Sequence, residues 1–373
     1  MVATTLKRQD AELLSSRVAG HQAFSRPESK AAPVLGYAAL RSDDVECQRV
    51  VLLGGLGVIG KMHARIYRDL GIPFTPIDPM GGGDWRRTLD QVDWSGTVVD
   101  ICTPTATHGD CLEQMYARGA RLFIVEKPAA ICAASWRAQV SAMPDARIFV
   151  VHNYLFSQAF RLCREMMVEP IEISTIFNKD RLVDDENGRG ACPAGRLAHV
   201  LHIEAPHQFA MALALAPDLE VLGSDHFAFG GRSAHHPTPV AASVMLRNKA
   251  GKYATLRTHL RKPLQRTLRV TEWDGRIIEV RFPTYQQPRS VVLDHAVDGR
   301  TTKVFDGRDD MLSTTLRSAL KCLRHGEIPW EASASFAESV LERIDQSLLA
   351  AAAASMPGWM APRPVRHDCE RTS

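Results

Sequence analysis

A glycine-rich turn is the first feature of the chain whose residue types and spacing could do chemistry. A GxGxxG pattern, Gly55-Leu56-Gly57-Val58-Ile59-Gly60, follows the apolar run Val50–Leu53 directly. The first glycine permits a tight turn, the second lets the backbone approach a pyrophosphate, and the third lets a helix pack against the strand. The N-terminus of that helix offers free N–H groups to an anion. With a strand pattern before it and a helix pattern after it, this turn predicts a dinucleotide site rather than an ordinary glycine-rich turn.

An acidic residue after the next apolar run bears on the choice of dinucleotide. Asp78 ends the expected strand Ile72–Ile77, roughly 20 residues after the glycines. Its carboxylate can accept hydrogen bonds from the ribose hydroxyls and would repel a 2′-phosphate, which favours NAD over NADP. Arg86 and Arg87 follow a run of three glycines and could reach such a phosphate, so NADP stays open.

Small polar residues end a third apolar run and open a helix. They are Cys102, Thr103, Pro104 and Thr105, with His108 one turn later. In an open parallel sheet, ligands bind outside the carboxyl ends of the strands. Hydroxyl side chains on a proline-stiffened turn suit contact with a ribose and phosphates. His108 could instead pack locally, because single histidines are often structural.

A lysine stands at the end of a fourth apolar run, Leu122–Val125. Glu126, Lys127 and Pro128 follow this run. The proline restricts Lys127 to extended backbone, which limits where its ammonium group can point. At the carboxyl edge of the sheet, this ammonium group could donate to a hydroxyl or carbonyl oxygen and polarise it for hydride transfer.

Three histidines and a glutamate lie close together at 199–207. Glu204 precedes His207 by three residues, so a helix would put both on one side, although Pro206 can kink the helix and re-aim Glu204. An imidazole titrates near neutrality, which suits His207 to moving the proton of a reacting hydroxyl. Packing and helix capping are the alternative for this cluster. No HExxH arrangement occurs in it, and no metal is expected.

Taken in order, these motifs resemble the glucose–fructose oxidoreductase and inositol dehydrogenase family (Gfo/Idh/MocA). The matching elements are the glycine turn with Lys61-Met62-His63-Ala64, Asp78, Thr103-Pro104 with His108, and Glu126-Lys127-Pro128. The resemblance runs from Val50 to Phe160, and more loosely to residue 350. It implies a Rossmann domain, a second domain whose open antiparallel sheet often forms an oligomer interface, and NAD(P)-dependent chemistry on sugars, cyclitols or related hydroxy compounds. Lys127 then corresponds to the catalytic lysine of the family.

Two more segments extend the resemblance, with departures. Val151–Phe160 resembles the segment that leads into the second domain, and it places Asn153 beside the nicotinamide and Tyr154 beside the substrate. Many members carry Asp-x-x-x-His in the helix that faces the substrate. His207 matches the histidine, but Ile203 stands at the aspartate position and Glu204 lies one residue later. The resemblance implies Lys127 and His207 as catalytic residues, and Lys127, Tyr154 and His207 as substrate contacts. Glu204, which departs from the family pattern, is expected from its spacing to His207 to share the proton transfer.

Length and composition limit the number of domains and the class of protein that the chain can form. Its 373 residues suggest about two domains, and 45% hydrophobic with 23% charged residues is ordinary for a globular protein. A net charge of +3 argues against a dedicated nucleic-acid binder. The sequence has no run of 18 apolar residues and no export-signal pattern at its start, and its eight cysteines are scattered, which together favour the cytoplasm and no membrane contact.

Alternating strand and helix patterns predict an α/β architecture. The expected parts are an N-terminal extension (1–48, partly ordered), a doubly wound Rossmann domain (49–155), an α+β substrate and oligomerisation domain with a largely antiparallel open sheet (156–355), and a C-terminal tail (356–373). In the second domain we expect a long helix over 196–215. The strands expected there are 171–177, Val240–Leu246, Tyr253–His259, Leu268–Glu272 and Ile277–Val280.

Local signals predict how the second half turns and ends. Asp274-Gly275 and Asp298-Gly299 are two-residue hairpin signals. One closing helix is expected to start at Asp309/Asp310 and end at Gly326, and the other to start at a capping box, Ser335–Glu338.

Three functions are compatible with this arrangement. The first is an oxidoreductase in which Lys127 polarises the reacting oxygen while His207, with Glu204, handles the proton; its partner is a sugar-like small molecule, and it acts as a homodimer or homotetramer. An anionic substrate such as a nucleotide sugar could use Arg181, Arg189 and Arg196. The alternatives are a non-catalytic regulator that senses NAD or a metabolite, and an NAD-dependent glycoside hydrolase.

Overall fold

The computed structural model describes residues 49–78, 81, 85–180, 199–228, 239–284 and 287–354. All of them belong to one compact unit, residues 42–373. The expected N-terminal extension and C-terminal tail lie outside the described residues. The three arginines at 181, 189 and 196 and the side chain of Arg86 lie outside them as well.

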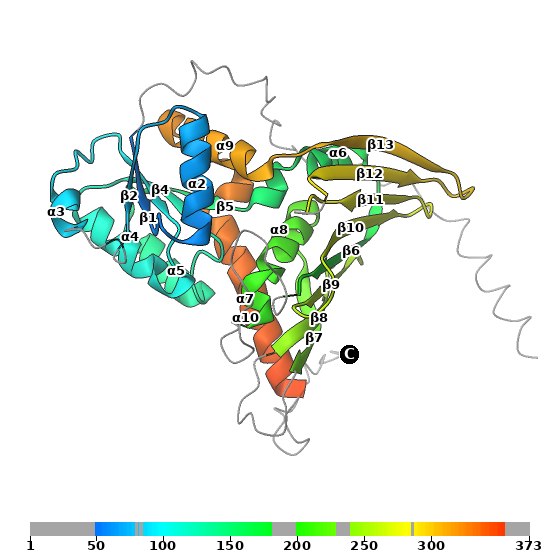
Figure 1. Cartoon of the computed structure of the whole chain (residues 1–373). Coiled ribbons are helices and arrows are strands. Elements are labelled where there is room, and N and C mark those ends of the chain that lie inside the picture. The colour runs from blue at the N-terminus through cyan, green and yellow to red at the C-terminus, as the bar shows by residue number, and fades with distance from the viewer. Residues whose placement is uncertain are drawn as a thin grey trace, which may run out of the picture. The chain divides into compact units, whose positions relative to one another are not determined.

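Five parallel strands form the first sheet, in the order β2-β1-β3-β4-β5 (Figure 1). The strands are β1 (Val50–Leu53), β2 (Phe74–Ile77), β3 (Val98–Ile101), β4 (Leu122–Glu126) and β5 (Arg147–Val151). The helices between them are α2 (Val58–Asp69), α3 (Trp85–Asp90), α4 (His108–Ala117) and α5 (Ala133–Ser141). Strands that are covered on both faces read as continuous apolar runs, which explains why the sequence revealed them. The doubly wound prediction is confirmed, with α3 added and β2 starting two residues later than expected.

The strand order reverses between β1 and β3, and this reversal positions the site. β2 pairs with one side of β1 and β3 with the other, so the segments that follow β1 and β3 diverge to opposite faces. In open α/β sheets this switch point is where dinucleotides bind. The glycine turn follows β1, and the Cys102–Thr105 segment follows β3.

An eight-stranded sheet follows, in the order β13-β12-β11-β10-β6-β9-β8-β7. Its strands are β6 (Pro170–Asn178), β7 (Glu220–Ala228), β8 (Pro239–Arg247), β9 (Tyr253–His259), β10 (Gln265–Glu272), β11 (Ile277–Arg281), β12 (Arg289–His295) and β13 (Thr301–Arg308). Only β6 and β9 pair in parallel, so the largely antiparallel prediction is confirmed. Both expected hairpins form, with Gly275 and Gly299 at φ of 90° and 84°. The sequence missed β7, β12 and β13; β13 is exposed along most of its length and has no apolar face to reveal it.

The helices of the second half correct two predictions. The long helix expected over 196–215 is broken at Glu204 into α7 (Val200–Ile203) and α8 (Ala205–Leu215). The break has a local cause, because Pro206 in the first turn of α8 has no N–H to continue a helix. The capping box at Ser335 was wrong, since α10 (Ala334–Ala354) starts earlier and the Ser333 hydroxyl accepts the Phe336 amide at 3.2 Å.

The remaining helices are α6 (Gln158–Met166) and α9 (Met311–His325). As expected, α9 is capped by Asp310 and ends at Gly326, which is left-handed at φ 83°. Helix α10 joins the two sheets: Trp136 of α5 donates to Ala334 O at 2.8 Å, and α10 also packs on α8 and β7. Within the described part of the chain, no helix has the length and apolar character that crossing a bilayer requires. The division at residue 155 stays a prediction.

Candidate active site

The glycine turn owes its shape to close packing against the end of β3. Gly54 has φ +79°, and a Cβ on it would lie 2.9 Å from the backbone of Cys102 and Thr103. A Cβ on Gly60 would lie 2.2 Å from Gly54 O, so only glycine lets α2 start this close to the strand. A Cβ on Gly57 would meet only Gly54 O, at 3.2 Å, which leaves its outer side open for a ligand. The sequence assigned the tight turn to Gly55, whereas the positive φ belongs to its neighbour Gly54.

Asp78 lies where the expected ribose contact should be. It follows β2 directly, and its Oδ2 accepts the backbone N–H of Leu56 at 3.1 Å. The carboxylate is therefore held beside the glycine turn, because Leu56 is the second residue of that pattern.

His108 lies between the loop after β3 and the loop after β4, at the carboxyl edge of the first sheet. The ring is buried, with Nε2 2.8 Å from Thr103 O and Nδ1 3.3 Å from Ala129 O. Burial lowers the pKa of this histidine, so it is neutral near pH 7 and carries a single N–H. It therefore donates to one of these two carbonyl oxygens and only contacts the other. This geometry supports the local packing alternative. Its place in the cofactor site stays a proposal, as the residue that fixes Thr103 relative to the Lys127 loop.

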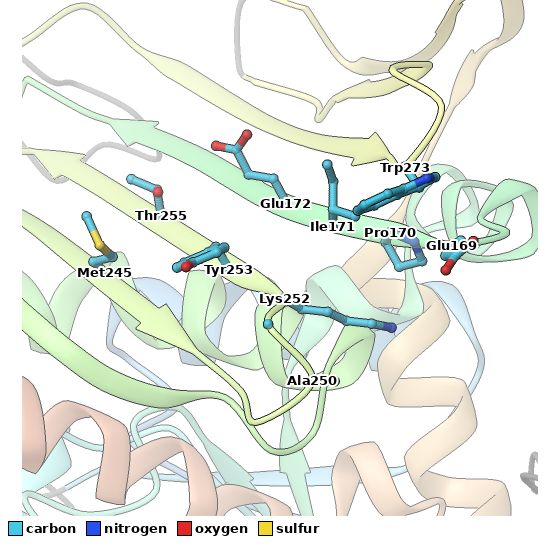
Figure 2. Close-up of a pocket in the computed structure, with 11 residues that line it drawn as sticks. Glu169, Pro170, Ile171, Glu172, Met245, Ala250, Lys252, Tyr253, Thr255 and Trp273 are labelled. Atoms are coloured by element: carbon cyan, nitrogen blue, oxygen red, sulfur yellow. The ribbon is translucent and has the colours of Figure 1, made fainter. Parts of the chain in front are cut away.

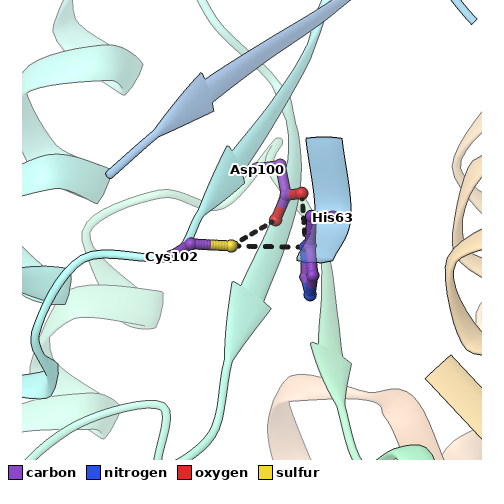
Figure 3. A group of neighbouring side chains, drawn as sticks. All are labelled: His63, Asp100 and Cys102. Atoms are coloured by element: carbon purple, nitrogen blue, oxygen red, sulfur yellow. Dashed lines mark hydrogen bonds and ion pairs between the residues drawn. The ribbon is translucent and has the colours of Figure 1, made fainter. Parts of the chain in front are cut away.

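A buried ionic network lies directly behind Lys127. His63 of α2 places Nδ1 2.7 Å from Asp100 Oδ2 and Nε2 3.2 Å from Glu126 Oε1. Tyr67 donates to the same Asp100 oxygen at 2.6 Å. Cys102 Sγ lies 3.2 Å from His63 Nδ1, beside the Asp100 carboxylate (Figure 3). Glu126 Oε2 in turn accepts the backbone N–H of Lys127 at 3.1 Å.

The network keeps a charge on His63. Burial alone would lower the pKa of the imidazole, but the charge of the Asp100 carboxylate and its hydrogen bond to the ring raise this pKa well above 6.5. Burial and Asp100 also raise the pKa of Tyr67, so its hydroxyl stays a donor. An imidazolium between two carboxylates thus ties the start of α2 to the ends of β3 and β4.

A metal ion does not suit this network. His63, Asp100 and Cys102 hold their ligand atoms within 4.8 Å of one another. Around zinc, an imidazole nitrogen and a carboxylate oxygen each about 2.0–2.2 Å from the ion would lie roughly 3.2 Å or more apart. The 2.7 Å separation of His63 and Asp100 fits a direct hydrogen bond instead.

Lys127 enters a cavity of about 370 Å³ between the two sheets. The half-buried ammonium group donates to Ile203 O, the last carbonyl of α7, at 2.9 Å. The cavity is lined by Ile59, Met62, Glu126, Lys127, Asn153, Tyr154, Lys179, Glu204, His207, Arg266, Pro283, Thr284, Pro288, Arg308, Asp309, Asp310, Met311 and Leu312. The cavity therefore lies between the first turns of α2 and the strand ends of the second sheet.

His207 faces this cavity from the first turn of α8. Its ring packs on Tyr154, with centroids 4.6 Å apart, and its buried Nδ1 has no hydrogen-bond partner among the described residues. Burial, together with the charges of Lys127, Arg266 and Lys179, lowers the pKa of His207 well below 6.5. A neutral imidazole with a free nitrogen can accept a proton.

Comparisons with known proteins bear on what this arrangement is. No protein-family model matches the chain. The chain is similar to the inositol 2-dehydrogenase of Rhizobium meliloti (strain 1021), at 31% identity over 145 residues. That match covers 34% of this chain and 44% of the relative, so the chain spans less than half the length of this curated relative.

Solved structures extend the likeness over most of the chain. UDP-N-acetylglucosamine 3-dehydrogenase GnnA from Acidithiobacillus ferrooxidans superposes with a TM-score of 0.65 at 17% identity, covering 81% of this chain and 97% of that one. Levoglucosan dehydrogenase, in complex with NADH and L-sorbose, superposes with a TM-score of 0.62 at 17% identity, covering 82% and 96%. At such identities the superpositions show a shared fold.

The resemblance to the Gfo/Idh/MocA family is confirmed. The departure from the Gfo/Idh/MocA pattern at Ile203 now has a structural reading. Where the family motif has an aspartate, this chain presents a backbone carbonyl to Lys127, and Glu204 stands at the N-cap of α8 beside it. Glu204 and His207 do share one cavity, as the spacing predicted.

The cavity gathers part of the site expected from the Gfo/Idh/MocA resemblance and adds other residues. The residues predicted to be catalytic, to contact the substrate and to lie beside the nicotinamide line the cavity together. The glycines of the turn, Asp78, the Cys102–Thr105 segment and His108 are not among its lining. The sequence missed Lys179, Arg266 and His152. His152 is 2% exposed, its two ring nitrogens have no hydrogen-bond partner among the described residues, and burial and Lys127 lower its pKa to about 3. Its position next to Asn153 was the one signal that could have found it.

Proposed function

We propose that the chain is an NAD(P)-dependent oxidoreductase. It transfers a hydride between a nicotinamide and a hydroxyl-bearing or keto carbon of a sugar, sugar nucleotide, cyclitol or related hydroxy compound. One observation supports this proposal above all: Lys127 and His207 line the same cavity as the first turns of α2. Helix α2 is the helix that follows the glycine turn. The named activities of the similar proteins, an inositol dehydrogenase and two sugar dehydrogenases, support the same reaction class.

The proposed dinucleotide site fits the residues present. The open side of Gly57 and the start of α2 at Val58 suit a pyrophosphate, because backbone N–H groups are exposed there. Asp78 would accept the ribose hydroxyls, with Thr103 and Thr105 lining the opposite side and Asn153 nearer the nicotinamide. The carboxylate of Asp78 favours NAD, and Arg87 keeps NADP open. When bound, the nicotinamide would accept or supply the hydride.

The chain's own residues would manage the oxygen and its proton. The Lys127 ammonium can share its donors between Ile203 O and a substrate oxygen, and it would stabilise negative charge that develops there. His207 is neutral near pH 7, and its imidazole would take the hydroxyl proton during oxidation, or return it during reduction. Glu204 lies three residues before His207 and lines the same cavity, so it could share the proton transfer.

Two variants test this proposal. Lys127→Met and His207→Asn should each lower kcat by at least about 100-fold, the usual size of a general acid–base contribution, with little change in NADH affinity. Energy transfer from tryptophan to NADH measures that affinity separately from turnover. Full turnover by His207→Asn would contradict the assigned role. Tight NADH binding by a wild-type protein that turns over no sugar, cyclitol or nucleotide sugar would favour the regulator instead.

The open face of the eight-stranded sheet supports the proposal of a homodimer or homotetramer. Trp273 is 73% exposed, and Met245 and Tyr253 are also exposed on this face (Figure 2). They line a hollow of about 710 Å³ that contains none of the proposed catalytic groups. Exposed apolar patches of this kind mark association surfaces. Trp273→Arg should reduce the particle size in light scattering, and an unchanged size would count against this interface.

A cytoplasmic location also stays a proposal. It is supported by the described cysteines, which are all free thiols: Cys102, Cys111, Cys132, Cys163 and Cys322.

A further inference from the structure

A bridge of two side chains connects the helix that follows the glycine turn to Lys127. His63 lies in the second turn of α2 and is fully buried. Its Nε2 lies 3.2 Å from Glu126 Oε1, and the other carboxylate oxygen, Oε2, accepts the backbone N–H of Lys127 at 3.1 Å. Glu126 therefore uses one oxygen for α2 and the other for Lys127.

The remainder of the buried network fixes the direction of the His63 ring. Asp100 Oδ2, near the end of β3, lies 2.7 Å from His63 Nδ1 (Figure 3). The same oxygen accepts the Tyr67 hydroxyl at 2.6 Å. Tyr67 follows His63 by four residues on α2, so both side chains lie on one side of that helix. Because Nδ1 is held in this way, the ring can turn very little and Nε2 stays directed at Glu126.

Lys127 is held at both ends of its side chain. Glu126 holds its backbone N–H, and the ammonium group at its tip donates to Ile203 O at 2.9 Å. Glu126 and Lys127 line the catalytic cavity, whereas His63 and Asp100 are not among its lining. His63 can therefore influence a molecule in that cavity only through Glu126 and Lys127.

The bridge is made of buried charged groups, although a contact that only supports the fold needs none. His63 and Asp100 are 0% exposed, and Glu126 is 8% exposed. Well-packed apolar side chains of similar volume often stabilise a fold as well as a buried ion pair does, because they require no desolvation of charge. Apolar side chains could not accept the Lys127 N–H, however. The choice of residue types therefore favours a role in placing Lys127.

We propose that His63 is a positioning residue, which acts through Glu126 to hold Lys127 where its ammonium group reaches the reacting oxygen. A displacement of about 1 Å in such a group can lower turnover about 100-fold. This inference rests on the proposed function, in which Lys127 polarises that oxygen. It adds a residue that lies outside the cavity and that links Lys127 to the helix of the proposed pyrophosphate site.

The experiment measures how fast Lys127 of the full chain is acetylated by acetic anhydride, with mass spectrometry of the peptides as the readout. Only the neutral amine reacts, and the hydrogen bond to a carbonyl oxygen favours the charged ammonium form. Lys249, at an exposed turn, is the reference for the reagent. Lys179, which is 4% exposed in the second half of the chain, reports any general loosening of the fold.

Two variants break the bridge. In His63→Leu and in Glu126→Ala, Lys127 should react about 10-fold faster or more relative to Lys249, the usual effect of losing a hydrogen bond to a charged group. The reason is that the bond to Ile203 O is no longer supported from behind. Lys179 should react as in the wild type. If His63→Leu does not fold, Glu126→Ala tests the same bridge.

Two further variants keep the bridge and are the matched controls. In Glu126→Gln, the amide oxygen can accept the Lys127 N–H while the amide nitrogen donates to a neutral His63, so the Lys127 rate should stay close to that of the wild type. Asp100→Asn leaves His63 able to donate to Glu126 but should make the protein easier to unfold. Lys127 should remain protected in this variant under native conditions.

The outcomes that would overturn the proposal are distinct. An unchanged Lys127 rate in the bridge-breaking variants would contradict it, and equal acceleration of Lys127 and Lys179 would mean that the network only supports the fold. Acceleration in Glu126→Gln as large as in Glu126→Ala would also contradict the bridge. NADH affinity is measured in parallel by energy transfer from tryptophan. A wild type that binds no NADH would undo the proposed function, whereas the acetylation rates would still decide whether His63 positions Lys127.

Discussion

The buried network behind Lys127 leads to a sharp prediction for Asp100→Asn. The substitution keeps the shape of the side chain and removes its charge. Asp100 is fully buried and holds both His63, at 2.7 Å, and the Tyr67 hydroxyl, at 2.6 Å. Removing one partner of a buried ion pair typically costs about 3–5 kcal/mol, because the other charge is left without compensation. The free energy of unfolding should fall by about that amount at pH 7.

The loss should depend on pH in a defined direction. In the wild type, the raised pKa of His63 contributes stability that is fully present below the unfolded pKa of about 6.5 and is lost as pH rises through the folded pKa. In Asp100→Asn the main opposing charge is gone, so burial should hold the His63 pKa below 6.5. The variant then loses stability on acidification below pH 6.5. The difference between the two proteins should therefore grow as pH falls from 9 to 5, by up to about 1.4 kcal/mol per unit.

Urea unfolding followed by circular dichroism at several pH values measures this difference. Asp69→Asn is the matched control, because Asp69 lies 3.8 Å from Arg65 in an exposed pair whose side chains are 65% and 79% accessible. Such pairs contribute little, so the control should behave as the wild type does. A loss below about 1 kcal/mol in Asp100→Asn, or a difference that shrinks on acidification, would refute the charged network.

Three further predictions concern the proposed site. Gly60→Ala should weaken NADH binding more than 10-fold, because its Cβ would lie 2.2 Å from Gly54 O, whereas Gly223→Ala, with open space around it, should not; equal affinities would contradict the turn geometry. The pH profile of kcat/KM should show no inflection near 6.5 from His207, whose pKa is lowered well below that value; an inflection there that disappears in His207→Asn would count against a neutral base. Asp78→Asn should raise the affinity for NADPH relative to NADH about 10-fold in fluorescence titrations, and an unchanged ratio would remove Asp78 from cofactor selection.

Local features of this protein were readable from the sequence because their causes are local. Strands β1, β3, β4 and β5 of the first sheet were readable because burial on both faces makes them short, largely apolar runs, whereas the edge strand β2 is partly exposed. The hairpins at Gly275 and Gly299 follow from two-residue turns that need positive φ. The site motifs share this property, since the glycine turn and Lys127 each end a buried strand and so must reach the same sheet edge.

Pairing across the fold could not be read in this way. β13 has little apolar surface and is defined by its hydrogen bonds to β12. The two carboxylate partners of His63 lie 37 and 63 residues away from it in the sequence. Lys127 donates to the backbone carbonyl of Ile203, 76 residues away, and every residue has such a carbonyl. In these cases residue type carries no signal of its partner.

The proposed substrate side shows the same division between sequence and structure. The motifs in the sequence indicated an oxidoreductase site with Lys127 and His207, because the type and spacing of these residues already limit the chemistry. Which charges surround that site was decided by strand register, which sets Lys179 and Arg266 on the face of the sheet that bears Phe177. Side chains alternate between faces with a period of two, so a shift of one residue in β6 or β10 would turn these cations away. Only the tertiary structure, through contacts between distant strands, determines that register.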